Sequence, residues 1–137
     1  MTSIATIKTT GQGLYDVTHK VAEVVSRRGV DECLITVFLR HTSASLVIQE
    51  NADPSVQHDL ANFLGSLVPE SDELYTHTAE GADDMPAHIK AALTQTSLTI
   101  PVMAGQMALG TWQAIYLWEH RHAPHERELV ISLSAVL

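Results

Sequence analysis

The sequence predicts a single α+β domain, residues 1–137, with a mainly antiparallel β-sandwich-like core and two or three helices. The length of 137 residues and the hydrophobic fraction of 45% suit one domain with a buried core. Short apolar and β-branched runs dominate both ends of the chain, and amphipathic helical patterns interrupt them. No glycine-rich turn of the dinucleotide-binding or P-loop type occurs, which disfavours a doubly wound parallel sheet.

Strands are expected where β-branched and apolar residues run together. The first half of the chain has such runs at residues 2–10, 33–40 and 44–49. The run at 33–40 is almost continuous, which predicts a central strand covered on both faces. Gly11 and Gly13 predict a turn after the first strand. In the last third, strands are expected at residues 97–103, 107–109, 113–118 and 128–137.

Helices are expected from a cap at Asp16 or Thr18 to about residue 28, at residues 54–67 and at residues 88–93. Gly29 follows the first helix as a left-handed stop. The second begins with Asp53 as N-cap and a proline at the first helical position. Asp84 and Pro86 repeat this start signal before the third. The apolar stripe of the second helix consists of Val56, Leu60, Phe63, Leu64 and Leu67.

Composition excludes several classes of function. The formal net charge of -8 disfavours binding to a nucleic-acid backbone. The single cysteine, Cys33, rules out an intrachain disulfide and a cysteine-based zinc knuckle. Residues 1–13 lack the apolar segment of a secretion signal, and no apolar run has the length of a membrane span. We therefore expect a cytoplasmic protein without a membrane partner.

The segment 77–88 concentrates titratable groups, with two imidazoles and three carboxylates. Such density is typical of metal sites and acid–base sites. His77 and His88, together with His41 from the other half of the chain, would form a three-histidine site with an open fourth position. Glu80 and Asp84 are candidate acid–base groups, although Asp84 has an alternative role as an N-cap.

Two further polar segments follow strand 33–40 and strand 44–49. In the first, the hydroxyls of Thr42, Ser43 and Ser45 could bind an anion, or they could only bond the local backbone in a polar turn. In the second, Glu50 is a candidate general base. Its neighbour Asn51 is a candidate for substrate binding.

A third polar segment covers residues 110–113, with Arg127 further along the chain. Trp112 could form an apolar wall beside a ligand, with Gln113 next to it. Arg127 could bind phosphate or carboxylate as a bidentate fork. The alternatives are an ordinary core tryptophan and a solvated arginine.

Ordered blocks covering nearly the whole chain resemble one family. The blocks are His41-Thr-Ser-Ala-Ser45, Glu50-Asn51-x-Asp53-Pro54, Asp59, Pro69, Tyr75-x-His77, Glu80-Gly-Ala-Asp-Asp-Met-Pro-Ala-His-Ile-Lys90, Ser97-Leu98, Gly110-Thr-Trp-Gln113 and Glu119-His120. They are similar to the YjbQ-like family, often named secondary thiamine-phosphate synthase. Gln95, Ala114 and the C-terminal Ala-Val-Leu depart from its pattern, and all lie outside the titratable set.

The resemblance implies a compact α+β domain and a homotrimer with pockets near the subunit interfaces. It also implies thiamine-phosphate synthase activity, which joins hydroxymethylpyrimidine pyrophosphate to a thiazole phosphate. On this interpretation a divalent ion, zinc or magnesium, is bound by His41, His77 and His88. The acid–base candidates are Glu50, Glu80 and Asp84, and the sequence does not decide between them. The phosphorylated substrate contacts Thr42, Ser43, Ser45, Asn51, Trp112, Gln113 and Arg127. The alternatives are a metal-dependent phosphate-ester hydrolase and a small-molecule- or metal-binding oligomer in which the synthase activity is incidental.

Overall fold

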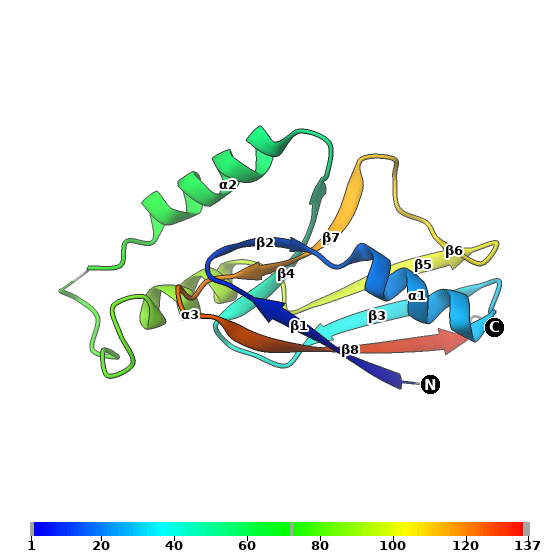
Figure 1. The fold of residues 1–137 in the computed structure, drawn as a ribbon, viewed down its shortest axis with the longest axis horizontal. Coiled ribbons are helices and arrows are strands. Elements are labelled where there is room, and N and C mark those ends of the chain that lie inside the picture. Colours follow the sequence, from blue (N-terminus) through cyan, green and yellow to red (C-terminus); the bar gives the residue numbers. More distant parts are fainter. Residues whose placement is uncertain (1, 72, 136–137) are drawn as a thin grey trace.

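A computed structural model describes residues 2–71 and 73–135, and the chain folds as an α+β domain, as predicted (Figure 1). The elements in chain order are β1 (Thr2–Thr9), β2 (Gly13–Asp16), α1 (Thr18–Arg28), β3 (Cys33–Leu39), β4 (Ala44–Glu50), α2 (Pro54–Leu67), α3 (Asp84–Leu93), β5 (Ser97–Met103), β6 (Gln106–Met107), β7 (Gln113–Glu119) and β8 (His125–Ala135). Within the described ranges, no helix combines the length and the hydrophobicity needed to cross a bilayer.

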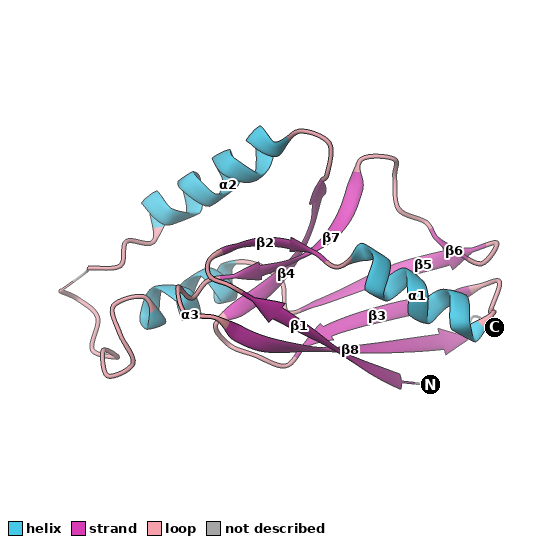
Figure 2. Ribbon diagram, in the orientation of Figure 1, coloured by secondary structure: helices cyan, strands magenta, loops and turns pink. Residues whose placement is uncertain are grey.

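The strands form two antiparallel sheets (Figure 2). The larger sheet has the order β1-β8-β3-β5-β6, and the smaller has the order β2-β7-β4. One hydrophobic core joins them: Ile35, Ile100 and Ile131 of the larger sheet belong to the same buried cluster as Leu46 and Leu117 of the smaller. The two sheets and helix α1 therefore share a single interior.

Strand β3 is central, as predicted, but the expectation that both of its faces are covered is wrong. Its side chains alternate between buried and more exposed positions, and Leu34 and Phe38 are exposed. This is the pattern of a strand with one face on the core. The apolar residues on the second face made the run look continuous in the sequence.

Helices α1 and α2 differ in how much of their surface packs against the two sheets. Helix α1 buries Val21, Val24 and Val25 and ends at Gly29, which has a φ of +63°. Helix α2 begins as predicted, with Asp53 accepting a hydrogen bond from the Ser55 backbone N–H. Yet Leu64 is the only buried residue of α2, while Phe63 is 69% exposed. Figure 1 shows α2 standing away from the sheets, so most of its apolar stripe does not face this core.

Other boundaries differ from the predictions. Strand β2 lies where a turn is expected, and β6 covers 106–107 instead of 107–109. Strand β8 begins at 125 rather than 128, and the predicted strand residues 136 and 137 lie outside the described ones. Helix α3 starts at Asp84, so the N-cap is Asp83 and not Asp84. The Asp84 side chain is consequently available for another role.

Candidate metal centre

Helix α3 and the loop before it bring together His77, Asp84 and His88. Asp84 and His88 are separated by one helical turn, so their side chains share one face of α3. Gly81 has a φ of +110° and turns the preceding loop, with the Asp84 backbone N–H donating to its carbonyl. This turn carries His77 back to the first turn of the helix.

The three side chains converge on a small volume. Nε2 of His77 lies 2.7 Å from Oδ2 of Asp84, and Nε2 of His88 lies 3.4 Å from the same oxygen. The two imidazole rings are in an edge-to-face arrangement with centroids 5.3 Å apart. One ligand atom from each residue fits within 4.8 Å of the other two, the only such group of three or more found in residues 2–71 and 73–135.

A backbone contact fixes the tautomer of His88. Its Nδ1 lies 3.0 Å from the carbonyl oxygen of Thr42. A carbonyl oxygen can only accept a hydrogen bond, so Nδ1 carries the proton that it donates. In the neutral ring the Nε2 lone pair then faces Asp84. Donation from the second nitrogen to a carbonyl is how metal-binding histidines are usually oriented.

The Asp84 carboxylate is 2% exposed and is held from both sides. Its Oδ1 accepts a hydrogen bond of 2.8 Å from Arg121, while its Oδ2 faces the histidines. Arg121 also donates to the carboxylate of Asp83 and the carbonyl of Glu80, which ties it to the loop. Burial alone raises the pKa of Asp84, but hydrogen bonding with Glu80 and His77 and the charge of Arg121 lower it below its usual value. The group is therefore a carboxylate at neutral pH.

Of the predicted ligands and acid–base groups, the structure brings some into this cluster and leaves others outside. Glu80 is at the rim, with Oε2 at 3.9 Å from Nε2 of His77. His41 lies outside the group: its Nε2 accepts a hydrogen bond of 2.8 Å from the backbone N–H of Glu128. Burial, followed by the charge of Arg127, lowers the pKa of His41 and favours this neutral acceptor.

The predicted anion-binding hydroxyls mostly have partners inside the protein. Thr42 contributes its carbonyl to His88. The buried Ser43 accepts a hydrogen bond from Arg127, and the buried Ser45 lies 2.8 Å from Nε2 of His120.

Arg127 is neither a free fork for phosphate nor a solvated side chain. It is buried, and its Nε donates to Glu119 at 2.8 Å. Glu119 also accepts from Thr9. Burial raises the pKa of Glu119, but these hydrogen bonds and the charge of Arg127 lower it overall. The Arg127–Glu119 pair is thus a buried ion pair of the interior.

The acid–base candidate Glu50 and the remaining predicted substrate-binding residues lie near the opposite end of β4, outside the cluster. Glu50 follows Ala44 by six strand positions, which corresponds to about 20 Å. The backbone N–H of Asn51 donates to the carbonyl of Trp112, and the Gln113 side chain accepts from the Gly110 N–H. Trp112 is 62% exposed, so it is not a core tryptophan.

Three residues that lie close to the cluster or line the adjacent cavity were absent from the predicted site: Lys90, His120 and Arg121. Arg121 and His120 follow β7 directly, and their side chains serve different surroundings. Arg121 reaches the aspartates of α3, whereas His120 is buried beside Trp118 with ring centroids 5.5 Å apart. Successive side chains of a strand point to opposite sides, so the sequence could have suggested that His120 and Arg121 face different surroundings.

Comparison with known proteins agrees with the fold. The sequence profile of the UPF0047 protein YjbQ-like family matches residues 3–135. A UPF0047 protein from Synechocystis sp. is 54% identical over 131 residues, covering 96% of this chain and 89% of the relative. The UPF0047 protein YjbQ of Escherichia coli O157:H7 is 40% identical over 129 residues, covering 93% of both chains.

A crystal structure of a YjbQ/UPF0047 family protein from Clostridium acetobutylicum superposes with a TM-score of 0.88. Its sequence is 35% identical, and the alignment covers 96% of this chain and 98% of that one. The profile, the relatives and the superposition agree over almost the full length. The chain therefore belongs to the YjbQ-like UPF0047 family.

Proposed function

We propose that the protein binds a divalent metal ion at His77, Asp84 and His88 and acts there on a phosphorylated small molecule. The observation that carries this proposal is the convergence of two imidazole Nε2 atoms on one oxygen of a buried carboxylate. The Thr42 carbonyl presets one of these imidazoles for binding through Nε2.

The geometry fits a small ion with limited adjustment. Neighbouring ligand atoms of a tetrahedral zinc site are about 3.3 Å apart, given metal–ligand bonds near 2.0–2.1 Å. The separation of 3.4 Å between His88 and Asp84 matches this value. The His77–Asp84 separation of 2.7 Å is that of a direct hydrogen bond, so the half-exposed His77 ring would retract slightly. Two nitrogens and one oxygen favour zinc over magnesium, which prefers oxygen ligands.

The surrounding residues suit chemistry on a phosphate ester or a pyrophosphate. A divalent ion held by three protein ligands keeps an open position and can polarise a phosphoryl oxygen. Arg121 keeps Asp84 ionised, and the exposed Glu80 carboxylate can accept a proton at the rim. His77 is about half exposed, so a substrate can approach from its side.

As the specific reaction we propose the condensation of hydroxymethylpyrimidine pyrophosphate with a thiazole phosphate, which releases pyrophosphate. Its support is the resemblance of the ordered sequence blocks, together with the phosphorylated nature of both substrates. The second candidate is a metal-binding oligomer in which this activity is incidental, and a homotrimer is proposed in both cases. The exposed apolar side chains of α2, such as Phe63, favour an oligomer.

Metal analysis of protein purified without chelator tests the site. We expect close to one equivalent of divalent metal per chain, lost in the His88→Ala and Asp84→Asn variants. His58→Ala is the matched control, because His58 is an exposed histidine of helix α2. Equal metal content in all four proteins would contradict the proposed ligands.

Turnover assays separate the candidate functions. With both thiamine precursors, pyrophosphate release that is lost in His88→Ala supports the synthase. Hydrolysis of a generic phosphate ester without the thiazole partner indicates a hydrolase instead. Metal binding without turnover of either kind at high enzyme concentration leaves the binding oligomer.

A further inference from the structure

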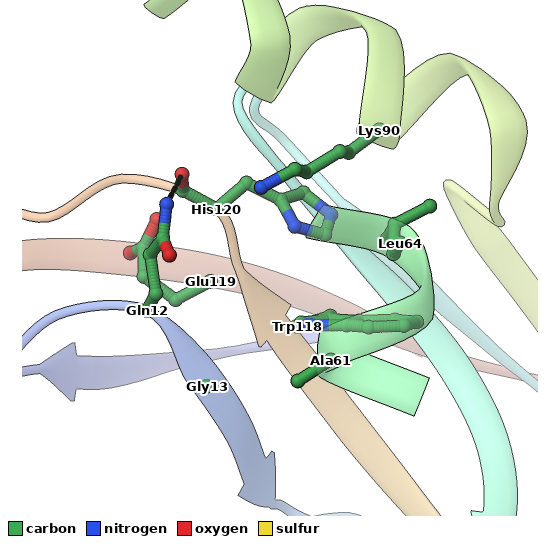
Figure 3. A pocket seen from close by; sticks show the side chains of 8 residues that line it. All are labelled: Gln12, Gly13, Ala61, Leu64, Lys90, Trp118, Glu119 and His120. Carbon is green, nitrogen blue, oxygen red and sulfur yellow. Dashed lines mark hydrogen bonds between the residues drawn. The ribbon is translucent and has the colours of Figure 1, made fainter. Parts of the chain in front are cut away.

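A second feature of the fold is a cavity of about 190 Å³ between β7, α2 and α3 (Figure 3). Its volume greatly exceeds the roughly 10–15 Å³ that one water molecule requires. Leu64, Ala61 and Trp118 form an apolar part of the wall. The polar part includes Lys90 and His120, which do not belong to the metal cluster.

Lys90 is the most informative residue of this cavity. It is 6% exposed, and no hydrogen bond or ion pair of its ammonium group is found within residues 2–71 and 73–135. Figure 3 shows its side chain extending from α3 toward the imidazole of His120. Within the described residues, no fully buried polar side-chain atom lacks a hydrogen-bond partner, so the ammonium keeps access to the cavity. An anion bound there would be attracted to this charge in partly desolvated surroundings.

The carboxylate nearest to this cavity cannot serve as the counterion. Glu119 lines the cavity, but its oxygens accept hydrogen bonds from Thr9, Arg127 and the backbone N–H of Arg121. Its charge is balanced by Arg127 in the buried ion pair. The remaining formal charge at the cavity is therefore the positive charge of Lys90, in a chain whose net charge is -8.

His120 adds a neutral polar group. It is 1% exposed, and burial followed by the nearby Lys90 charge lowers its pKa to about 3. Nε2 is at hydrogen-bond distance from the Ser45 hydroxyl. Within the described part of the chain, no hydrogen bond is found for Nδ1. When Nε2 accepts from the Ser45 hydroxyl, Nδ1 carries the proton of the neutral ring and can donate it to an anion.

We propose that this cavity binds a small oxyanion, a phosphate or carboxylate group, through Lys90 and His120, with Trp118 as its apolar wall. The site goes beyond the proposed metal centre and does not depend on it. Lys90 and His88 both extend from α3, but His88 belongs to the metal cluster while Lys90 lines this cavity.

Fluorescence of Trp118 provides a local test. The chain has two tryptophans, so a Trp112→Phe background leaves Trp118 as the only emitter. Chelator-treated protein is titrated with inorganic phosphate, and separately with acetate, at an ionic strength kept constant with chloride. We expect a saturable emission change and an increase in the thermal unfolding midpoint. A stronger response to phosphate than to acetate identifies a phosphate site, and the reverse order identifies a carboxylate site.

Two variants and one control make the test specific. Lys90→Met should weaken anion binding at least tenfold, whereas Lys20→Met removes a lysine of α1 outside the cavity and should leave binding unchanged. Ala61→Phe fills the cavity without altering Lys90 and should also abolish the response, which keeps the test valid if Lys90→Met fails to fold.

The absence of a saturable response to either anion, or equal binding by the parent and Lys90→Met, would overturn the proposal. Because the chelator treatment removes bound metal from the sample, this result is independent of the metal centre. His88→Ala, which tests that centre, should retain the anion response in full.

Discussion

The carboxylate of Asp84 accepts a hydrogen bond from Nε2 of His77 across the turn that precedes α3, with 2.7 Å between the two atoms. The contact uses only one oxygen of the carboxylate, because the other is bound by Arg121. The arrangement resembles a metal site in which a proton takes the place of the ion. For a divalent ion to replace this proton, the two atoms would have to separate to the roughly 3.3 Å between neighbouring ligands of a tetrahedral zinc site.

The neighbouring Asp83 and Asp84, at the start of α3, should therefore differ sharply in their effect on metal affinity. Asp84→Asn removes a converging ligand, and we expect affinity to fall by at least roughly 100-fold, since loss of an outer-shell partner alone costs 10–100-fold. Asp83→Asn is the control, because Asp83 bonds Arg121 and the His122 backbone but neither histidine of the cluster. Competition with a chromogenic chelator measures both. Similar losses in the two variants would argue against Asp84 as a ligand.

The buried Glu119–Arg127 pair should be a major contributor to stability. Glu119→Gln leaves the Arg127 charge uncompensated in the interior, and we expect a loss of about 3–5 kcal/mol in the free energy of unfolding. Glu126→Gln, on an exposed position of β8, should change it by less than about 0.5 kcal/mol. Denaturant unfolding monitored by circular dichroism provides the values. A loss for Glu119→Gln as small as the control's would mean that the interior solvates Arg127 by other means.

His120 predicts a specific dependence of stability on pH. Its pKa is about 3 in the folded protein against 6.5 in an unperturbed histidine. As the pH falls below 6.5, the unfolded chain takes up a proton that the folded chain does not. Stability should therefore decrease toward pH 3, with a slope of up to about 1.4 kcal/mol per pH unit from this residue.

Unfolding free energies measured between pH 7 and pH 4 isolate this contribution. His120→Gln should flatten the profile, whereas His58→Gln, on the exposed side of α2, should keep the parent slope. Parallel profiles for all three proteins would show that His120 does not titrate as proposed.

Two glycines predict opposite effects of the same substitution. Gly29 has a φ of +63°, so alanine there is strained although no atom lies within 4 Å of its added Cβ, and we expect a loss of about 1 kcal/mol. Gly65 lies within α2 with equally free space, and alanine should stabilise the helix by about 0.5–1 kcal/mol. Thermal unfolding of the two single variants, compared with the parent protein, measures both effects. A loss of stability at both positions would show that the space around Gly65 is needed.

Much of the fold could be predicted because local signals were strong. Asp53 and Pro54 marked the start of α2, and Gly29 marked the end of α1, since caps act over a few neighbouring residues. Strand β2 was missed because four residues, the first of them Gly13, carry too little periodicity. The exposure of Phe63 could not be foreseen, because an amphipathic pattern does not show which surface covers the apolar side.

The site was predictable only in part, for a similar reason. The density of titratable neighbours points to His77 and His88, but it marks Asp84 only as an acid–base candidate or an N-cap, and the sequence does not show that its carboxylate lies between the two imidazoles. The pairing of Arg127 with Glu119 joins strands of different sheets and has no local signature. Lys90 was overlooked because burial, and not residue type, makes a lysine unusual.

The end of β7 has a consequence for how this protein can vary. Glu119, His120 and Arg121 are consecutive, yet they contact the buried ion pair, the cavity and the aspartates of α3 respectively. A one-residue insertion within β7 would turn each of these side chains toward the wrong surroundings, so three separate arrangements would fail together. Insertions just after the strand, at the exposed positions 122–124, leave the directions of these three side chains unchanged. We therefore expect insertions to be tolerated there.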